Sequence, residues 1–231
     1  MAESTKKNRD KKIQIIIIDD HPIVRHGIAQ LINMQQDLVV CGEAKDSTEG
    51  WDAIKEKDPD LVIVDLSLEN ASGLDLIKAL SARRPDLALL VLSMHDENLY
   101  AERAIRSGAM GYVMKQEATE TLINAIYQVL KGEIFVSEKI KTRLLQRLLR
   151  GEPGTSQDEE YSIVVDLTDR ELEVFQLIGK GLSTRKIASK LNLSIKTIET
   201  HRQNIKQKLN LNDSTELVQQ AVQWVQSMDM K

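Results

Sequence analysis

The feature that most constrains the fold is a five-fold alternation of short apolar runs with amphipathic stretches over residues 13–130. The runs are rich in Ile, Val and Leu and are largely apolar at consecutive positions: 13–18, 38–41, 61–64, 87–92 and 111–114. The stretches between them carry apolar residues near helical spacing: 23–33, 47–57, 74–83, 98–107 and 119–130. Strands buried on both faces and separated by helices predict an α/β domain with a doubly wound, five-stranded parallel sheet.

The pattern changes after residue 130. Residues 140–149 have the spacing of a basic amphipathic helix, and residues 150–160 contain Gly, Pro, Ser and acidic residues typical of a linker. Four further helices are predicted at 169–179, 184–191, 195–209 and 215–226, which form an all-α four-helix domain. We therefore expect a flexible N-terminus at 1–12, a first domain at 13–130, a linker with its helix at 131–166 and a second domain at 167–231.

Composition narrows the class of function. Aromatic residues make up 3% of the chain, which disfavours an aromatic-lined pocket for an organic ligand. Residues 168–231 carry a formal charge of +3 and the rest of the chain −7, so the second domain is the candidate for nucleic-acid binding. The single cysteine, Cys41, is expected to be a small buried side chain. No signal peptide or membrane-spanning run is visible, and a soluble cytoplasmic protein is expected.

Acidic side chains follow two of the predicted strands. Asp19 and Asp20 come directly after the first, and Asp65 after the third, so a parallel sheet would bring the three carboxylates to one edge. Their mutual repulsion is relieved best by a hard cation with oxygen ligands, most naturally Mg²⁺. Ser93 and Lys115 stand at the ends of the fourth and fifth strands. Together these residues predict a phosphoryl-transfer site in which Asp65 is the nucleophile.

Four segments of this domain resemble the flavodoxin-like receiver domain of bacterial NarL/FixJ-type response regulators. They read IIIIDDHPIVRHG, LVIVDLSLENASGLDLI, LLVLSMHDE and GAMGYVMK, and the resemblance covers about residues 13–130. It implies that Asp65 is the phosphoacceptor, with Asp20, Asp65 and the Ser67 backbone carbonyl as direct Mg²⁺ ligands and Asp19 as a supporting carboxylate. It also implies that Ser93 and Lys115 stabilise the phosphoryl group.

The resemblance further implies that Tyr112 is an aromatic switch, which the residue pattern alone does not indicate. Ser93 stands where many receivers have Thr, and Gln116 follows Lys115 where others have Pro. His21 and His95 lie beside the site residues. No further ligands at zinc-like spacing accompany them, so we expect ordinary roles for both, with a weak influence of His95 on dephosphorylation.

The second domain carries helix signals in a specific order. Thr168 and Glu171 predict a capping box, Ser183 caps the next helix, and the short turn 192–194 joins the second helix to the third. The segment LTDRELEVFQLIGKGLSTRKIASKLNLSIKTIETHRQNIKQKL resembles the LuxR-type helix-turn-helix over residues 167–209. In that arrangement the helix at 195–209 enters the major groove of DNA.

The resemblance assigns base contacts to three side chains: Glu199, Thr200 and Gln203. Basic or hydroxyl side chains around them are candidates for phosphate contacts: Lys196, Thr197, Arg202, Lys206 and Lys208. The last helix carries an apolar stripe that the family uses for dimerisation, although packing within the domain is an alternative: Leu217, Val218, Ala221, Val222 and Val225.

The sequence thus predicts a two-component response regulator rather than a metabolic enzyme. Its receiver would take a phosphoryl group from a sensor histidine kinase, lose it slowly by its own chemistry, and control binding to double-stranded DNA as a homodimer. RNA polymerase is a further candidate partner. An aspartate-nucleophile phosphatase of the haloacid-dehalogenase type would need a second Asp where Ser67 stands. A small-molecule-sensing LuxR-type regulator and a receiver that works without phosphate remain as rivals.

Overall fold

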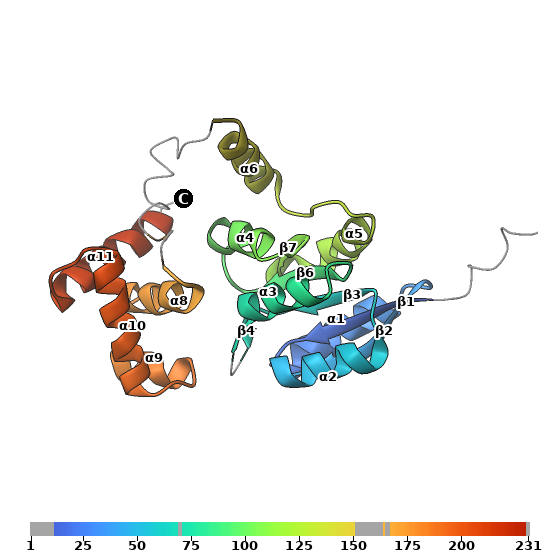
Figure 1. Ribbon diagram of the computed structural model, residues 1–231, viewed down its shortest axis with the longest axis horizontal. Helices are drawn as coiled ribbons and strands as arrows, with labels where there is room; N and C mark the ends of the chain where they lie inside the picture. Colours follow the sequence, from blue (N-terminus) through green and yellow to red (C-terminus); the bar gives the residue numbers. More distant parts are fainter. Residues whose placement is uncertain (1–11, 69–70, 151–163, 165–166, 230–231) are drawn as a thin grey trace, which may run out of the picture. The chain divides into compact units, whose positions relative to one another are not determined.

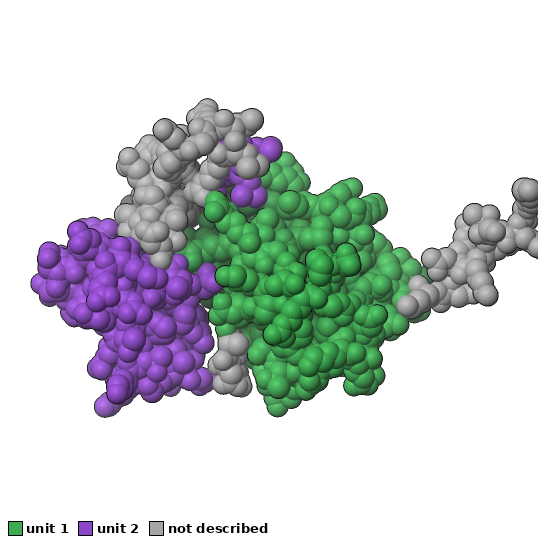
Figure 2. Space-filling view, in the orientation of Figure 1, with its two compact units in different colours: residues 1–142 green, residues 143–231 purple. Residues whose placement is uncertain are grey.

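The computed structural model describes residues 12–68, 71–150, 164 and 167–229 (Figure 1). The chain divides into two compact units, residues 1–142 and residues 143–231 (Figure 2). The predicted flexible N-terminus, apart from Lys12, and residues 151–163 of the predicted linker lie outside the described residues. Within the described ranges, no helix has the length and hydropathy needed to span a bilayer.

The first unit is built on a parallel sheet of five strands in the order β2-β1-β3-β6-β7. The strands are β1 (Ile13–Ile18), β2 (Leu38–Ala44), β3 (Leu61–Val64), β6 (Ala88–Ser93) and β7 (Gly111–Met114). The helices between them are α1 (Pro22–Asn33), α2 (Ser47–Lys57), α3 (Gly73–Arg83), α4 (Glu97–Arg106) and α5 (Ala118–Leu130) (Figure 1). The strand order reverses beside β1, so the predicted doubly wound fold is confirmed.

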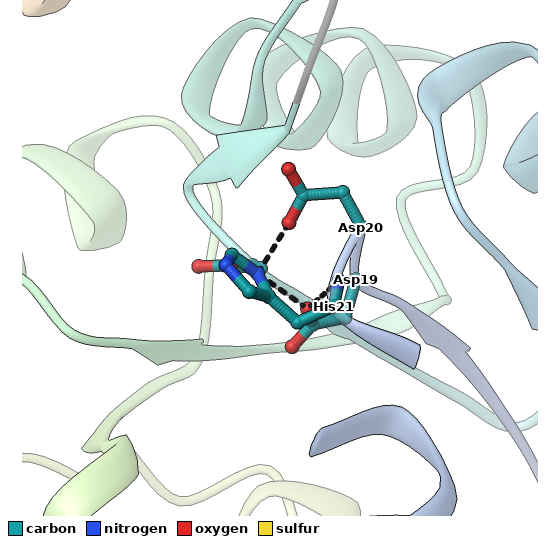
Figure 3. Close-up of side chains that lie close together, drawn as sticks. Asp19, Asp20 and His21 are labelled. Atoms are coloured by element: carbon teal, nitrogen blue, oxygen red, sulfur yellow. Dashed lines mark hydrogen bonds and ion pairs between the residues drawn. The ribbon is translucent and has the colours of Figure 1, made fainter. Parts of the chain in front are cut away.

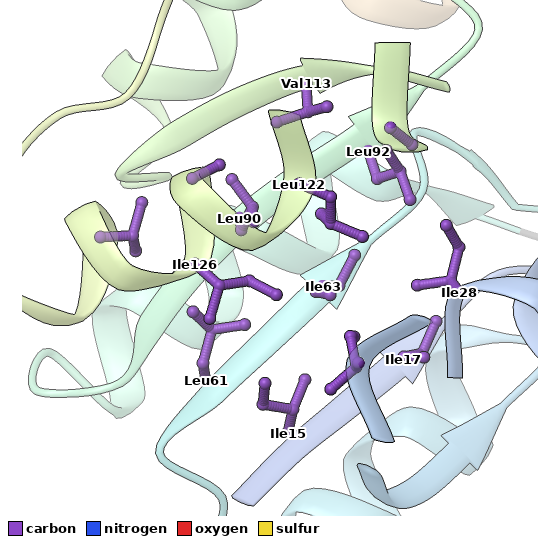
Figure 4. Packing of buried hydrophobic residues seen from close by; sticks show 14 of the residues in the cluster. Ile15, Ile17, Ile28, Leu61, Ile63, Leu90, Leu92, Val113, Leu122 and Ile126 are labelled. Atoms are coloured by element: carbon purple, nitrogen blue, oxygen red, sulfur yellow. The ribbon is translucent and has the colours of Figure 1, made fainter. Parts of the chain in front are cut away.

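Alternate residues of the strands pack on opposite faces of the sheet. Ile15 and Ile17 of β1 point to the face covered by α1 and α5, where they join a continuous buried cluster (Figure 4). Ile18 points to the other face, where its side chain lies against Gly50 of α2. Burial on both faces is why these strands are apolar at consecutive positions instead of alternating with polar residues.

The predicted end of β2 is wrong by three residues. The parallel pairing of β1 with β2 runs from Ile15 opposite Val40 to Ile16 opposite Gly42, so Cys41 is an extra residue in the ladder. The bulge lets the strand continue to Ala44. It also leaves Cys41 only partly buried, with its Sγ donating to the Ile15 carbonyl at 3.5 Å. Cys41 is therefore not the fully buried side chain that its apolar neighbours predicted.

Short elements follow β3 that periodicity did not predict. Ser67–Leu68 (β4) pairs in antiparallel fashion with Ala71–Ser72 (β5), and α3 begins directly after this small hairpin. A 3₁₀ turn, η1 (Lys115–Glu117), separates β7 from α5. The amphipathic helix predicted at 140–149 is α6 (Glu138–Arg150). The β4–β5 hairpin and η1, unlike α6, are too short to carry a periodic signal.

The second unit contains α8 (Asp169–Gly179), α9 (Thr184–Lys190), α10 (Ile195–Lys208) and α11 (Ser214–Asp229). The predicted caps are present. Thr168 and Glu171 form a capping box on α8, and Ser183 accepts a hydrogen bond from the first turn of α9. Ser194, for which no cap was predicted, does the same for α10. Asn192, between α9 and α10, has a positive φ of 51°, which asparagine tolerates well. Local chemistry therefore sets the bounds of these helices.

The core of the second unit lies between α8, α10 and α11. The ring of Phe175 in α8 packs against that of Trp224 in α11, with 5.5 Å between the ring centroids. Ile198 and Ile205 of α10 are fully buried. Gly179 allows α8 and α11 to approach closely, because a Cβ there would lie 2.3 Å from the Ala221 carbonyl oxygen. Burial of Ile198 and Ile205 turns the apolar face of α10 toward this core and leaves its polar face outside.

An ion pair between a buried carboxylate and an exposed lysine joins the first turn of α8 to the last turn of α10. The Lys208 Nζ donates to Glu171 Oε2 at 2.7 Å, and the same oxygen accepts from the Thr168 amide at 2.8 Å. Glu171 is 3% exposed. Burial alone would raise its pKa, but Lys208 and the Thr168 hydrogen bonds outweigh burial and hold the pKa below the ordinary value. The charged carboxylate therefore stabilises the fold.

We expect Glu171→Gln to lower the stability of the second unit by about 1–3 kcal/mol near neutral pH, because Lys208 loses a charged acceptor. Since the pKa of Glu171 is lowered by folding, this stability is present above the unfolded pKa and is lost as the pH falls through the folded value. The difference from the natural chain should therefore shrink on acidification. Urea unfolding followed by Trp224 fluorescence in a Trp51→Phe background measures it.

Glu173→Gln is the matched control. Glu173 pairs with Arg170 of the same helix at 2.7 Å, and both side chains are about a fifth exposed. Loss of this ion pair should lower the free energy of unfolding by less than about 1 kcal/mol. Equal costs for the two variants, or a Glu171→Gln effect that grows on acidification, would contradict the role given to the Glu171–Lys208 pair.

Candidate functional site

The three predicted carboxylates meet at the carboxyl edge of the sheet. Asp19 and Asp20 follow β1, Asp65 follows β3, and each offers an oxygen within 4.8 Å of the others and of a His21 nitrogen. Asp19 and Asp65 are each only 2% exposed. Parallel strands place the residues that follow them side by side, which is why residues 46 positions apart in sequence come together.

Lys115 supplies the positive charge of this cluster. Its Nζ lies 2.7 Å from Asp65 Oδ2 and 2.7 Å from Asp19 Oδ2, and its side chain is 6% exposed. Burial by itself would lower the pKa of Lys115. The two carboxylates outweigh it, so the pKa lies above its ordinary value and the ammonium stays charged. The single ammonium of Lys115 therefore offsets only part of the negative charge of the three carboxylates.

His21 lies closer to the acidic cluster than the sequence suggested. Its Nδ1 is 2.6 Å from Asp20 Oδ1 and 3.4 Å from Asp19 Oδ1, and its backbone amide donates to Asp19 Oδ1 at 2.8 Å (Figure 3). The Asp20 Oδ1 atom is buried and makes no hydrogen bond of good geometry despite this approach. Burial, together with repulsion from Asp65 and Asp19, raises the pKa of Asp20 above its ordinary value in spite of His21.

This donor set fits a hard divalent cation. Three carboxylates with a buried oxygen short of a hydrogen bond are the ligands that Mg²⁺ prefers, and a cation there would favour the charged form of Asp20. The loop that carries Ser67 is held close to the cluster: Ser67 N donates to Asp65 Oδ1 at 3.2 Å. Gly73 makes this loop compact, because a Cβ there would lie 2.2 Å from the Asp65 carbonyl oxygen.

A hydrogen-bonded series leads from the end of β6 into the strand β7. Ser93, the last residue of β6, is fully buried, and its Oγ accepts from the His95 amide at 3.2 Å. The carbonyl of His95 accepts from the Tyr112 hydroxyl at 2.8 Å. Burial raises the pKa of Tyr112 above its ordinary value, so the phenol remains a donor. Tyr112 is thus tied to the loop that follows Ser93.

The role of His95 is a feature that sequence reasoning missed. Its Nε2 lies 2.9 Å from Ser67 Oγ, and its ring stacks on Tyr100 of α4 with 4.5 Å between ring centroids. His95 therefore links the β3–α3 loop to α4 across the site. The pairing joins residues 28 positions apart, and no spacing in the sequence indicates it.

The predicted DNA-reading side chains lie on the exposed side of α10. Glu199, Thr200 and Gln203 are all exposed, opposite the buried Ile198 and Ile205. The Thr200 hydroxyl donates to the Lys196 carbonyl of its own helix at 3.0 Å, which leaves its methyl group and its oxygen lone pairs to face outward. A polar face of this kind next to a short turn suits a helix that enters the major groove.

The predicted phosphate-contact residues differ in how freely they can reach a ligand. Lys196 is exposed, whereas Arg202 is half-buried, and burial lowers its pKa although Glu199 acts against this. The Thr197 amide and hydroxyl both contact Ser194 Oγ at the start of α10. Lys208 donates to the buried Glu171. Lys208 therefore forms an ion pair within the domain. Contact of Lys206 and Lys208 with DNA phosphates stays a prediction.

The apolar stripe of α11 is divided between the domain core and the surface. Leu217 and Ala221 are fully buried and Val225 is 8% exposed, whereas Val218 is 40% exposed and Val222 is partly buried. Trp224, which was not part of the predicted stripe, is also buried. Core packing therefore accounts for three of the five residues, and Val218 and Val222 are the two that remain at least partly exposed.

Comparison with known proteins supports both units. The family model described as the response regulator receiver domain matches residues 15–127, and the model described as bacterial regulatory proteins of the luxR family matches residues 165–221. The oxygen regulatory protein NreC of Staphylococcus carnosus is 36% identical over 213 residues, which cover 91% of this chain and 97% of NreC. The transcriptional regulatory protein DegU of Brevibacillus brevis is 32% identical and covers 97% of this chain and 99% of DegU.

Solved structures of similar proteins include complexes with DNA. RcsB from Salmonella enterica serovar Typhimurium, bound to the rprA promoter in the presence of the phosphomimetic BeF₃⁻, is 28% identical with a TM-score of 0.59, and the match covers 92% of this chain and 99% of RcsB. A structure of two RcsB dimers bound to two parallel DNAs is 30% identical, with a TM-score of 0.54 and coverage of 91% and 98%. This chain therefore belongs to the NarL/FixJ-type two-component response regulators, with a receiver domain followed by a LuxR-type helix-turn-helix domain.

Proposed function

We propose that Asp65 accepts a phosphoryl group from a phosphohistidine of a sensor kinase and that this event controls sequence-specific DNA binding by a dimer. The observation that carries the proposal is the placement of the Lys115 ammonium at 2.7 Å from both Asp65 and Asp19, at a sheet edge where three carboxylates converge. Such an arrangement provides a nucleophile, a site for a divalent cation and a fixed positive charge for the transferring oxygens.

The residues that would hold Mg²⁺ are Asp20, Asp65 and the Ser67 backbone carbonyl, with Asp19 in support. When bound, Mg²⁺ neutralises charge on the attacking carboxylate and on the transferring phosphoryl oxygens. Asp20 Oδ1 is suited to direct contact because it is buried and lacks a well-formed hydrogen bond. His21 borders the same oxygens, but a hard cation prefers oxygen to imidazole nitrogen, so we assign His21 to positioning Asp20.

In the transfer step an Asp65 carboxylate oxygen attacks phosphorus. The new P–O bond forms as the P–N bond of the phosphohistidine breaks, and the imidazole leaves with the bonding electron pair. Lys115 is already beside Asp65 Oδ2 and can pair with a phosphoryl oxygen with little movement. The Ser93 hydroxyl, at the end of the neighbouring strand β6, would donate to another. Slow loss of the group to water would return Asp65 to its free form.

The switch follows from what Ser93 already contacts. Its Oγ accepts from the His95 amide, and the His95 carbonyl accepts from the Tyr112 hydroxyl. If Ser93 turns toward a phosphoryl group, the loop that carries His95 and the ring of Tyr112 must adjust with it. The added charge of about −1 to −2 at Asp65 thereby shifts the population of receiver states rather than creating a new one.

DNA binding and dimerisation are assigned to the second unit. Glu199, Thr200 and Gln203 are proposed to read base edges, while Lys196, Thr197, Arg202, Lys206 and Lys208 contact phosphates. Val218 and Val222, the less buried residues of the α11 stripe, are proposed as the centre of a dimer contact. The RcsB dimers on DNA support this reading by analogy.

The test of the proposal uses the full-length chain with Mg²⁺ and acetyl phosphate, followed by intact-mass measurement. Addition of one phosphoryl group is expected, and peptide mapping should locate it at Asp65. DNA fragments selected from a random-sequence library with the beryllium fluoride form then serve as probes. Beryllium fluoride should tighten binding to them by at least about five-fold, the lower end of typical allosteric coupling. An unmodified chain whose DNA affinity does not respond would overturn the proposal.

Base readers and phosphate contacts should respond differently to substitution. Gln203→Ala is expected to alter which sequence is preferred, by about 1–3 kcal/mol at one base position, because it removes a base-edge partner. Lys206→Ala should weaken binding to all sequences alike and reduce the slope of log affinity against log salt by about 1. Binding to a panel of single-base variants at several salt concentrations measures both effects. Uniform losses for both variants would contradict the division of roles.

A further inference from the structure

A segment after α5 completes the outer edge of the receiver sheet. Phe135 N donates to the Met110 carbonyl at 2.9 Å, and Tyr112 N donates to the Phe135 carbonyl at 2.8 Å. These bonds form a parallel bridge between Phe135 and Gly111 of the edge strand β7. We call residues 133–136 the edge segment. It occupies hydrogen-bonding groups that an edge strand would otherwise expose.

The edge segment is anchored by side chains as well as by its backbone. Phe135 packs against the receiver core, and Val136 is 4% exposed. Gly111 makes room for this contact, because a Cβ at Gly111 would lie 3.2 Å from the Cβ of Phe135. The segment is therefore a fixed part of the sheet edge and should follow movements of β7.

Tyr112 joins this edge to the phosphoryl site through two different polar groups. Its hydroxyl donates to the carbonyl of His95, whose amide donates to Ser93 Oγ, and its backbone amide donates to the carbonyl of Phe135. Both donors belong to one residue, so a displacement of Tyr112 that includes its backbone alters both hydrogen bonds. The same residue thus faces the site on one side and the edge segment on the other.

The edge segment also leads directly into α6. Ser137 follows it, and the Ser137 carbonyl and Oγ accept from the amides of Lys141 and Ile140 in the first turn of α6. Ile140 is fully buried. Only Ser137 separates the edge segment from the first residue of α6, so the start of this helix is fixed by the position of Phe135. Any signal carried by the chain toward the DNA-binding domain must pass this point.

We propose that the edge segment transmits the state of Asp65 from Tyr112 to the start of α6, and that this requires both its main-chain hydrogen bonds to β7 and the packing of the Phe135 ring against the core. The proposal rests on the proposed function, because it requires that phosphorylation at Asp65 moves Tyr112. It assigns to Phe135 a role in coupling and none in phosphoryl chemistry. Substitution of Phe135 should therefore separate uptake of the phosphoryl group from its effect on DNA binding.

Amide hydrogen exchange tests the first half of this proposal in the full-length chain. Addition of Mg²⁺ and beryllium fluoride is expected to change the exchange rates of the Tyr112 and Phe135 amides by at least about five-fold, since both amides donate across the same edge. Unchanged rates at both amides in a chain that accepts a phosphoryl group would overturn the edge-segment proposal alone. A chain that accepts no phosphoryl group would overturn it together with the proposed function.

Variants of the edge segment test the second half. Phe135→Ala removes the anchoring ring, and Phe135→Pro removes the amide that donates to Met110. Ile134→Ala is the matched control, since Ile134 is the neighbouring side chain and is 49% exposed. All three should take up a phosphoryl group from acetyl phosphate. The tightening of DNA binding by beryllium fluoride should fall by at least about five-fold in either Phe135 variant and persist in the control.

Phe135→Pro disturbs the backbone at the sheet edge and is more liable to prevent folding than Phe135→Ala. Both variants are therefore measured. Phosphoryl uptake equal to that of the natural chain establishes that the receiver is intact in a given variant. If Phe135→Pro fails this requirement, Phe135→Ala decides the result, because truncation leaves the backbone donors in place. A full DNA-binding response in Phe135→Ala, with uptake unchanged, would overturn the proposal. Loss of the response in Ile134→Ala to the same extent would do so as well.

Discussion

Asp65→Asn is expected to take up no phosphoryl group from acetyl phosphate and to lose the DNA-binding response completely. A carboxamide is a poor nucleophile toward phosphorus, and it cannot serve as an anionic ligand to Mg²⁺. The same variant should be more stable than the natural chain when Mg²⁺ is removed, because one of three mutually repelling carboxylates is lost while Lys115 keeps Asp19 as a partner at 2.7 Å. Repulsion from Asp65 contributes to the raised pKa of Asp20, and the substitution removes it.

Intact-mass measurement and urea unfolding in EDTA or MgCl₂ check the two effects of Asp65→Asn. Stabilisation by Mg²⁺ should shrink in the variant, because weaker binding to the folded state gives less stabilisation at the same concentration. Asp52→Asn is the control: Asp52 lies on α2, its side chain is 76% exposed, and its nearest cation, Lys55, is 3.9 Å away. A variant that lost stability in EDTA would contradict the view that the three carboxylates repel one another.

Gly179→Ala should destabilise the DNA-binding domain by about 3 kcal/mol or more. The added Cβ would lie 2.3 Å from the Ala221 carbonyl oxygen and 2.5 Å from Val225 Cγ2, so α8 and α11 would have to move apart. Overpacking of this kind typically costs about 1–3 kcal/mol, and contact with backbone atoms leaves little room for relief by side-chain rotation. A large loss of DNA binding should follow, because α10 packs on α8 and depends on the same core.

Trp224 reports on this domain, since its ring packs on Phe175 beside the α8–α11 contact. Urea unfolding of Gly179→Ala in a Trp51→Phe background, followed by Trp224 fluorescence, measures the cost. The control is Gly27→Ala in α1, where a Cβ meets nothing within 4 Å. That change, followed by Trp51 fluorescence, should stabilise the receiver by about 0.5–1 kcal/mol. Similar effects of the two substitutions would show that helix propensity, and not close packing, governs both positions.

The predicted meeting of the carboxylates and Lys115 at one edge of the sheet, which the structure shows, has a geometric cause. In a parallel sheet, residues that directly follow the strands gather at one edge, so the positions of Asp19, Asp65 and Lys115 in the chain are enough to bring them together. The predicted helix caps at Thr168 and Ser183 are present for a similar reason, since a cap depends on residues within one turn. Both predictions rest on rules that relate local sequence to a repeating geometry.

Contacts that depend on how separate segments pack against one another were beyond the reach of those rules. The hydrogen bond of His95 to Ser67, the pairing of Phe135 with Gly111 and the ion pair of Lys208 with Glu171 each join segments that no periodicity relates. The bulge at Cys41 belongs to the same group, because it depends on how β2 pairs with β1. These contacts arise when preformed strands and helices settle against one another.

By itself, the sequence determined the order of the five sheet strands and the helices between them, the doubly wound sheet and the identity of the residues at its carboxyl edge. Periodicity and the chain direction fix these features before any packing detail is known. Only the tertiary structure decided how the charges pair, which residues of the α11 stripe are buried and how Tyr112 is connected to Ser93 and Phe135. Those choices depend on distances of a few ångströms between distant segments, and they are settled by close packing and by the need to satisfy buried polar groups.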